Sequence, residues 1–360
     1  MFRVAFGILE EAVAARAFPA ASVAVTHQGK LVALRAFGHF TYDAASPEPT
    51  TATLFDIASV TKVLATTTMA MVLYERGLLD LDVPLISIGG EFSGEDPRRD
   101  EVTVRMLLTH SSGLPAYEKL FLRAHTREQL LEAAFATALA NDPGSHAEYS
   151  DIGFILLGVA LERLADESLD RFCQREIFGP LGLTHTTFNP APELRAWIPP
   201  TADDQTFRHR IVQGEVQDEN ASVMGGVSGH AGLFSTAQDL AIFAHILLQG
   251  GSPILRPETI SLFTEHRSAP EGTSRALGWD TPSSPSQSGK HFSPRSYGHL
   301  GYTGTSLWID PDRQLSVTLL TNRTWPDCKN RAIKQVRPKF HDAVIEALPA
   351  TTLVLNQGES

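Results

Sequence analysis

Strand patterns lie near both ends of this chain, whereas helical patterns fill its middle. Two apolar runs flank the polar turn Gln28-Gly29-Lys30, and a second pair, residues 299–310 and 315–322, flanks the turn Pro-Asp-Arg-Gln. Both patterns predict β-hairpins. The simplest fold class is therefore mixed α/β (α+β). One antiparallel sheet is built from both termini and flanked by helices, and an all-helical lobe is inserted between its two parts.

The length of the chain favours two lobes. It has 360 residues, more than the roughly 100–200 of a usual domain. We predict a discontinuous α/β sheet domain that comprises residues 1–79 and 252–350. A mostly helical domain comprises residues 80–251, and a C-terminal tail comprises residues 351–360.

Helical periodicity places individual helices within these divisions. Segment Ser59–Arg76 carries apolar residues at close to helical spacing, and Gly77 follows it as the expected C-cap. Ser235 is expected to begin another helix, as the N-cap of a capping box with Gln238. Pro338 lies inside the closing helix and is expected to kink or interrupt it.

Composition excludes some classes of partner. The formal net charge is -11, which disfavours nucleic acid because its binders present basic surfaces. The N-terminus is typical of an amphipathic helix and not of a signal peptide, and no stretch is apolar enough to span a bilayer. We therefore expect a cytoplasmic protein as the sequence stands, or a periplasmic one if the true start lies upstream, with no membrane partner. The oligomeric state is left open.

Nothing in the sequence indicates a metal or cofactor. The two cysteines, Cys173 and Cys328, lie far apart and form no metal-binding or redox spacing. Two ordinary thiols are expected, with a single disulfide as the alternative. No H-E-x-x-H motif occurs, and the glycines of segment 225–232 form no phosphate loop because no Lys-Ser/Thr follows them. We expect no metal site and no cofactor.

One pair of residues suggests nucleophilic chemistry. Ser59 stands three positions before Lys62 at the start of a long apolar segment, so both side chains lie on one face of the predicted helix. A serine hydroxyl needs a neighbouring base to become a good nucleophile. Lysine provides such a base when burial lowers its pKa. Ser-x-x-Lys alone is a weak motif, and Lys62 could instead extend from a structural helix to solvent.

Further motifs follow this pair in a fixed order, namely VTVRMLLTHSSGLP, PGSHAEYSDIGFILLG and GHLGYTGTSLWIDP. The ordered set resembles the penicillin-recognising serine hydrolases, which include class C β-lactamases, DD-peptidases, D-aminopeptidases and the related family VIII-type esterases. The stretch GEVQDENASVMGGVSGHAGLFSTAQDL is most similar to the penicillin-binding-protein 4B-like carboxypeptidases. The resemblance covers nearly the whole chain and implies a β-lactamase/transpeptidase-like fold.

The resemblance implies three catalytic residues. Ser59 would attack a carbonyl and form an acyl-enzyme, and Lys62 would accept the proton or tune the group that does. Tyr149 fills the position of the family's Tyr-x-Asn tyrosine, where a nearby ammonium would favour the phenolate and make it a general base. The backbone N–H groups of Ser59 and Tyr302 would form the oxyanion hole.

The resemblance also implies a substrate-binding strand. The family's Lys-Thr-Gly motif is matched here by His299-Leu300-Gly301. Substrate contacts are expected from Asp151, His299, Gly301 and Thr303.

Two positions depart from the family pattern. Asp151 stands where many members have asparagine, and an ionised carboxylate near Lys62 would favour the ammonium. This favours Tyr149 as the base with Lys62 as its electrostatic partner, although the choice between them stays open. His299 replaces a lysine that helps bind the carboxylate of β-lactams and of C-terminal D-alanine. Since histidine is only partly charged at neutral pH, we expect weak β-lactamase activity at most.

Two other histidines lie in glycine-rich turns. His110 is expected to be a hydrogen-bonded structural residue, whereas for His230 a structural role and a place beside the cleft are about equally expected.

The sequence thus predicts a serine hydrolase that acts through an acyl-Ser59 intermediate. The expected substrate is a peptide containing a D-amino acid, cleaved by a DD-carboxypeptidase, endopeptidase or D-aminopeptidase reaction, or else a small carboxylic ester. The alternative is a non-catalytic scaffold or binding protein that retains the fold.

Overall fold

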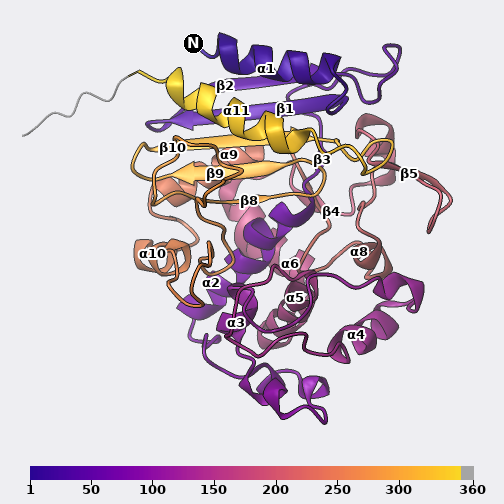
Figure 1. Ribbon diagram of the computed structural model, residues 1–360, viewed down its shortest axis with the longest axis vertical. Coiled ribbons are helices and arrows are strands. Elements are labelled where there is room, and N and C mark those ends of the chain that lie inside the picture. Colours follow the sequence, from indigo (N-terminus) through magenta and orange to yellow (C-terminus); the bar gives the residue numbers. More distant parts are fainter. Residues whose placement is uncertain (350–360) are drawn as a thin grey trace, which may run out of the picture.

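A five-stranded antiparallel sheet joins the two ends of the chain (Figure 1). The computed structural model describes residues 1–349. The strand order is β2-β1-β10-β9-β8, which confirms the predicted sheet built from both termini. The strands are β1 (Ala20–His27), β2 (Lys30–Gly38), β8 (Tyr297–Leu300), β9 (Ser306–Asp310) and β10 (Leu315–Thr321).

Helices cover both faces of this sheet, which explains why β1 and β10 are buried along their whole length. On one face, α1 (Arg3–Ala14) and α11 (Ile333–Glu346) pack against each other and share a core with Val23 and Val25. On the other face, α9 (Ala237–Leu248) contacts β1 and β10, and Ala24 belongs to that second core. Alternate residues of β1 therefore supply two separate cores.

The segment that carries Ser59 forms one helical run with three geometries. A 3₁₀ turn, η1 (Ala58–Val60), precedes a π-helical turn, η2 (Lys62–Thr67), and then α2 (Thr68–Glu75). Gly77 has φ +68°, and the Leu78 N–H bonds back to the Leu73 carbonyl, which confirms the predicted C-cap. π-Helical turns inside helices are frequent at functional sites.

The rest of the middle region is mostly helical, but it also contains short strands that the sequence analysis did not place. The α-helices are α3 (Val104–Leu108), α4 (Arg127–Phe135), α5 (Asp151–Ala165), α6 (Leu169–Cys173), α7 (Gly179–Leu181), α8 (Glu219–Val223) and α10 (Pro257–Thr264). The 3₁₀ helices are η3 (Leu85–Ser87), η4 (Gly90–Phe92), η5 (Pro97–Glu101), η6 (Leu120–Leu122) and η8 (Pro192–Trp197), and η7 (Gln174–Phe178) is π-helical. The short strands are β3 (Phe55–Asp56), β4 (Thr187–Phe188), β5 (Ala202–Asp204), β6 (Arg210–Val212) and β7 (Leu233–Ser235).

The predicted strand at 299–310 is wrong in one respect, because it divides into β8 and β9 around a turn. Gly304 has φ +96°, and a Cβ built there would lie 2.0 Å from Thr321 Oγ1. Only glycine fits this left-handed position against β10. The turn brings the end of β8 beside the segment of Ser59, since a Cβ at Gly301 would meet the Ile57 carbonyl at 2.5 Å.

Two predicted helix signals also need correction. The N-cap of α9 is Thr236, whose side chain accepts a hydrogen bond from the Asp239 N–H, whereas Ser235 ends β7. Of the two outcomes predicted at Pro338, a kink or an interruption, the interruption is wrong, because the closing helix runs through this residue. The carbonyl of Lys334, which loses its helical partner at the proline, accepts a hydrogen bond from Gln287 Nε2 at 3.1 Å instead.

The remaining sequence predictions concern the cysteines, membrane-spanning helices and the division into domains. Cys173 is buried, Cys328 is exposed, and both are free thiols. Within residues 1–349, no helix is both long and apolar enough to cross a bilayer. The division into two domains stays a prediction, and the predicted tail, 351–360, lies outside the described residues.

Candidate active site

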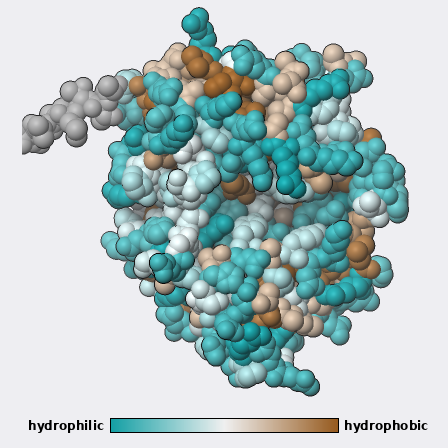
Figure 2. All heavy atoms as spheres, viewed as in Figure 1, coloured by the Kyte–Doolittle hydropathy of each residue, from teal (hydrophilic) through white to brown (hydrophobic). Residues whose placement is uncertain are grey.

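Three segments that are distant in sequence meet beside Ser59. They are the start of the helical run at residues 58–75, the start of α5 and the end of β8. Figure 2 shows a face on which hydrophilic residues predominate and which is hollowed between the sheet above and the helices below. Because β8 belongs to the five-stranded sheet and α5 to the helical region, the site lies where these two parts of the structure adjoin.

Lys62 is fully buried and uses all three of its ammonium hydrogens. Its Nζ donates to Ser59 Oγ at 3.1 Å, to Asp151 Oδ1 at 2.7 Å and to the carbonyl of His230 at 3.0 Å. Burial alone would lower the pKa of Lys62, but the Asp151 carboxylate and Tyr149 outweigh it, so the pKa is raised. The lysine is a buried ammonium at rest and does not extend to solvent.

Asp151 is the partner that keeps this ammonium charged. It opens α5, where Ser150 is the N-cap and accepts a hydrogen bond from the Gly153 N–H. The Asp151 N–H donates to the Ala116 carbonyl at 2.9 Å, which fixes the residue. Its side chain, 17% exposed, points at Lys62. The Asp151 carboxylate thus lies next to Lys62, as expected from the sequence, and it opposes the role of this lysine as a base.

Tyr149 lies between these groups. Its ring centroid is 4.8 Å from Lys62 Nζ, and its phenol interacts with Lys62 and Ser59. Burial and the Asp151 carboxylate nevertheless raise the pKa of Tyr149, and the two opposing contacts do not reverse that direction. The Lys62 ammonium lowers the pKa of Tyr149, as expected, but burial and Asp151 outweigh it, so the phenol is neutral in the resting site.

Two neutral histidines flank the tyrosine ring. The rings of His110 and His299 lie 4.7 Å and 6.0 Å from that of Tyr149. Burial, together with the positive charges of Arg275 and Lys62, lowers the pKa of both histidines well below its ordinary value.

Their hydrogen bonds fix the tautomers. His110 Nδ1 accepts from the Ser150 N–H at 3.1 Å, so its proton is on Nε2. His299 Nδ1 donates to the Leu300 carbonyl at 2.8 Å, so its Nε2 presents a lone pair. Both Nε2 atoms are buried and lack a hydrogen-bond partner among the described residues.

The end of β8 places the second group of predicted residues. The Gly301 N–H donates to the Thr305 carbonyl at 2.7 Å, and its lack of a side chain allows the close approach to Ile57 described above. The Tyr302 N–H donates no hydrogen bond within residues 1–349, and the residue is 51% exposed. Thr303 is fully buried, and its hydroxyl donates to the Asp56 carbonyl at 2.8 Å. This hydrogen bond holds the turn after β8 against the segment that carries Ser59.

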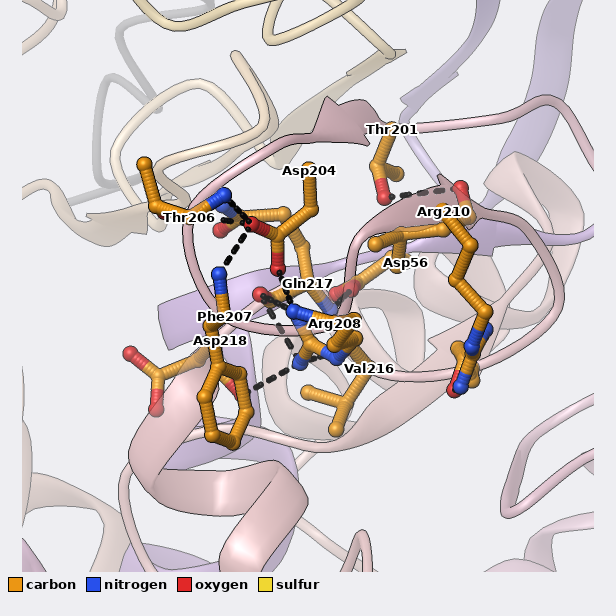
Figure 3. A network of polar contacts seen from close by, with 12 residues as sticks. Asp56, Thr201, Asp204, Thr206, Phe207, Arg208, Arg210, Val216, Gln217 and Asp218 are labelled. Atoms are coloured by element: carbon orange, nitrogen blue, oxygen red, sulfur yellow. Dashed lines mark hydrogen bonds and ion pairs between the residues drawn. The ribbon is translucent and has the colours of Figure 1, made fainter. Parts of the chain in front are cut away.

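Figure 3 shows a polar network that the sequence did not predict and that includes Asp56, just before Ser59. The buried guanidinium of Arg208 pairs with Asp204 at 3.2 Å and donates to the carbonyls of Gln217 and Asp218. The Gln217 N–H donates to Asp56 Oδ2 at 2.7 Å. Burial raises the pKa of Asp56 to about 6. The loop that leads to α8 is thereby tied to the residues just before Ser59.

His230 connects this network to the lysine. Its Nε2 donates to Asp218 Oδ1 at 2.9 Å, its Nδ1 lies 2.9 Å from Ser228 Oγ, and its carbonyl accepts the hydrogen bond from Lys62. The ring is 1% exposed. The ring of His230 is therefore a hydrogen-bonded structural group, while its carbonyl lies at the candidate active site, so both roles left open for this residue apply. No spacing in the sequence could have indicated these contacts.

Arg275 is a second residue that the sequence analysis missed. Its guanidinium carbon lies 5.5 Å from the centroid of the Tyr149 ring. The residue precedes a loop-rich stretch without periodicity, so no sequence pattern marked it.

Within the described residues, no other feature is as good a candidate for an active site. A pocket of about 540 Å³ is lined by residues of α9 and α10, such as Leu247, Ile260 and Thr264, and by none of Ser59, Lys62 and Tyr149. No group of three or more His, Cys, Asp or Glu side chains within residues 1–349 is arranged to hold a metal ion. The cluster around Ser59 is thus the best candidate.

Comparisons with known proteins show the family of this chain. A family model described as Beta-lactamase matches residues 7–337. A protein of Escherichia coli (strain K12) named "Putative D-alanyl-D-alanine carboxypeptidase" is 33% identical over 345 residues, which cover 85% of this chain and 79% of that protein. The N-acetylmuramyl-L-alanine amidase of Bacillus subtilis (strain 168) is 33% identical over 351 residues, covering 86% of this chain and 78% of that protein.

A solved structure confirms the predicted fold class. EstCE1, a hydrolase with promiscuous acyltransferase activity, matches with a TM-score of 0.78 at 21% sequence identity. The match covers 94% of this chain and 97% of that one.

Proposed function

The chain belongs to the beta-lactamase family of serine hydrolases, and from that membership we propose that it cleaves its substrate through an ester on Ser59. The substrate that we favour is a peptide with a D-amino acid at the scissile bond, and a small carboxylic ester is the other candidate. The contact of Ser59 with Lys62, and of both with Tyr149, carries the proposal.

The protonation of the site sets the order of proton transfers. Lys62 and Tyr149 both hold their protons at rest, because the pKa of each is raised. The reactive form is the one in which this pair has lost a proton. We assign the base to the Tyr149 phenolate of that form, since it lies beside Ser59 and the Lys62 ammonium stabilises it. Its phenol then returns the proton to the leaving group.

Backbone groups complete the mechanism. Ser59 lies in the first turn of a helical run, where N–H groups have no helical partner. Together with the Tyr302 N–H at the end of β8, the Ser59 N–H would hold the oxyanion of the tetrahedral intermediate. Water then hydrolyses the acyl-Ser59 ester in the same site.

The choice of substrate class rests on the relatives and on His299. The Escherichia coli relative carries the name of a D-alanyl-D-alanine carboxypeptidase at 33% identity, which favours a D-peptide. His299 is neutral and presents a lone pair, so it attracts a carboxylate less than a lysine would. We therefore propose weak β-lactamase activity at most.

A panel of substrates tests this proposal. Purified protein is assayed side by side with D-Ala-D-Ala peptides, D-aminoacyl anilides, p-nitrophenyl esters and nitrocefin, with Ser59→Ala as the control. We expect turnover of peptides or esters well above that of nitrocefin, and none by the variant. Turnover that persists in Ser59→Ala would refute the acyl-serine route. Absence of turnover of every substrate by folded protein would favour a non-catalytic scaffold.

A further inference from the structure

Two buried arginines hold the turn between β8 and β9, residues 301–305, and the proposed mechanism uses neither of them. We propose that Arg323 and Arg337 are positioning residues of the oxyanion hole, which hold this turn so that the Tyr302 N–H points at the reacting carbonyl. The proposal rests on the proposed function and deepens it, because it names the side chains that set the direction of the second oxyanion donor.

A hydrogen bond inside the turn sets the direction of the Tyr302 N–H. The Gly304 N–H donates to the Gly301 carbonyl at 3.0 Å, so this carbonyl points into the turn. The C=O and N–H groups of one trans peptide unit point in opposite directions. The Tyr302 N–H shares its peptide unit with the Gly301 carbonyl and therefore points out of the turn. Its direction is kept only as long as the turn keeps its shape.

Arg323, which follows β10, holds the first half of the turn. Its Nε donates to the Tyr302 carbonyl at 2.7 Å, and its guanidinium carbon lies 4.4 Å from the centroid of the Tyr302 ring. Its Nη1 donates to the carbonyls of Cys328 and Asn330, which anchor the guanidinium. The backbone N–H of Arg323 donates to the Thr303 carbonyl at 3.0 Å. One residue thus contacts both the main chain and the ring of Tyr302.

Arg337, in α11, holds the second half of the turn. Its Nη2 donates to the carbonyl of Gly304 at 2.9 Å and to that of Thr305 at 3.3 Å. Its Nη1 donates to Gln287 Oε1 at 3.0 Å. The Thr305 carbonyl also accepts the hydrogen bond from the Gly301 N–H, at 2.7 Å. A residue after β10 and a residue of α11 therefore hold the same turn.

Both guanidinium groups are buried, and neither pairs with a carboxylate among the described residues. Burial lowers the pKa of both arginines, that of Arg337 to about 9, where the positive charge of Arg323 adds to the effect. A buried charge without a partner is costly, and neutral donors could satisfy the same carbonyls. An oxyanion at the Tyr302 N–H would supply the negative charge that both arginines lack. The missing carboxylates thus fit a role in the reaction.

Two substrates that differ in one atom test the proposal. The kcat/KM of p-nitrophenyl acetate is divided by that of O-p-nitrophenyl thionoacetate, in which sulfur replaces the carbonyl oxygen. Sulfur is a weak hydrogen-bond acceptor, so a well-aimed N–H accelerates the ester more than the thionoester. Loss of one oxyanion donor costs about 10²- to 10³-fold in rate, and we expect Arg323→Gln, which misplaces one, to lower this ratio by about 10- to 100-fold. Arg323→Lys should retain part of the ratio, because it keeps the charge but not the planar fork.

Arg99→Gln is the matched control. Arg99 is also buried, and its guanidinium donates to the carbonyls of Phe92, Phe135 and Thr137, none of which belongs to the candidate active site. This variant should lose stability without a change in the ratio. Both rates are proportional to the amount of folded enzyme, so a partial loss of folding does not alter the ratio either.

The native ratio in Arg323→Gln, or an equal fall of the ratio in Arg99→Gln, would overturn the proposal. If Arg323→Gln does not fold, the ratio is measured in Arg323→Lys and Arg337→Lys, and native values in both would overturn it as well. Native protein that does not hydrolyse the ester would refute the proposed function and this proposal with it. Native turnover with a ratio that the arginine variants do not change would refute this proposal alone.

Discussion

Replacing Asp151 with asparagine is expected to make the catalytic base lose its proton at lower pH. The carboxylate lies 2.7 Å from Lys62 Nζ and raises the pKa of both Lys62 and Tyr149. An asparagine oxygen can still accept the hydrogen bond, but it carries no charge. The pKa of the base should fall whether the base is Tyr149 or Lys62, because the Asp151 carboxylate favours the protonated form of both residues.

The size of the effect follows from the contact. A hydrogen bond to a charged group contributes about 1.5–3 kcal/mol, and about 1.4 kcal/mol is a tenfold change in an equilibrium. Well below the midpoint of the pH profile, the fraction of Asp151→Asn enzyme with a deprotonated base should therefore be about 10- to 100-fold higher than in the wild type. The plateau at high pH should fall, because a base with a lower pKa is weaker.

The assay is kcat/KM for a p-nitrophenyl ester as a function of pH. The control is Asp170→Asn, which removes a carboxylate from the first turn of α6 and should leave the profile in place. The free energy of unfolding of Asp151→Asn should fall by about 1–3 kcal/mol, because a buried ammonium loses its counter-charge. A midpoint that stays where it is, or moves to higher pH, would refute the reasoning.

Three further outcomes are expected. Ser59→Ala should abolish turnover and change the Tm little, because it removes one small, half-buried hydroxyl; a large fall in Tm would show that Ser59 is structural. Tyr149→Phe should lower kcat by about 10²- to 10⁴-fold, the usual contribution of a proton-transfer group, and a variant that retains most of its activity would return the base to Lys62. The raised pKa of Asp56, about 6, means that its contribution to stability is present at low pH and is lost as the pH rises to about 6. In chemical denaturation, Asp56→Asn should therefore gain stability relative to the wild type between about pH 4 and 6, and a constant difference would contradict that assignment.

The features that were predicted correctly from the sequence are those that depend on residues close together in the chain. The apolar runs that flank polar turns near both ends predicted strands that pair in one sheet, and the spacing of Ser59 and Lys62 predicted side chains on one helix face. Gly77 was recognised as a helix end because its left-handed conformation is one that few other residues adopt.

What the sequence did not predict depends on contacts between distant segments. The network around Arg208 and Asp218 joins residues through carbonyl groups, which have no sequence signature. The neutral phenol of Tyr149 results from burial, which the sequence could not measure. Arg275 is placed by the pairing of a loop hairpin with β8, and the split of 299–310 into two strands depends on how closely Gly304 approaches β10.

Trapping the covalent intermediate tests the central claim most directly. The protein is treated with a fluorophosphonate or rapidly quenched during hydrolysis of a p-nitrophenyl ester, and its intact mass and peptide map are measured. The proposed mechanism predicts a single adduct on Ser59 and none in Ser59→Ala. Folded protein that forms no adduct with either reagent, or that carries it on another residue, would contradict the claim.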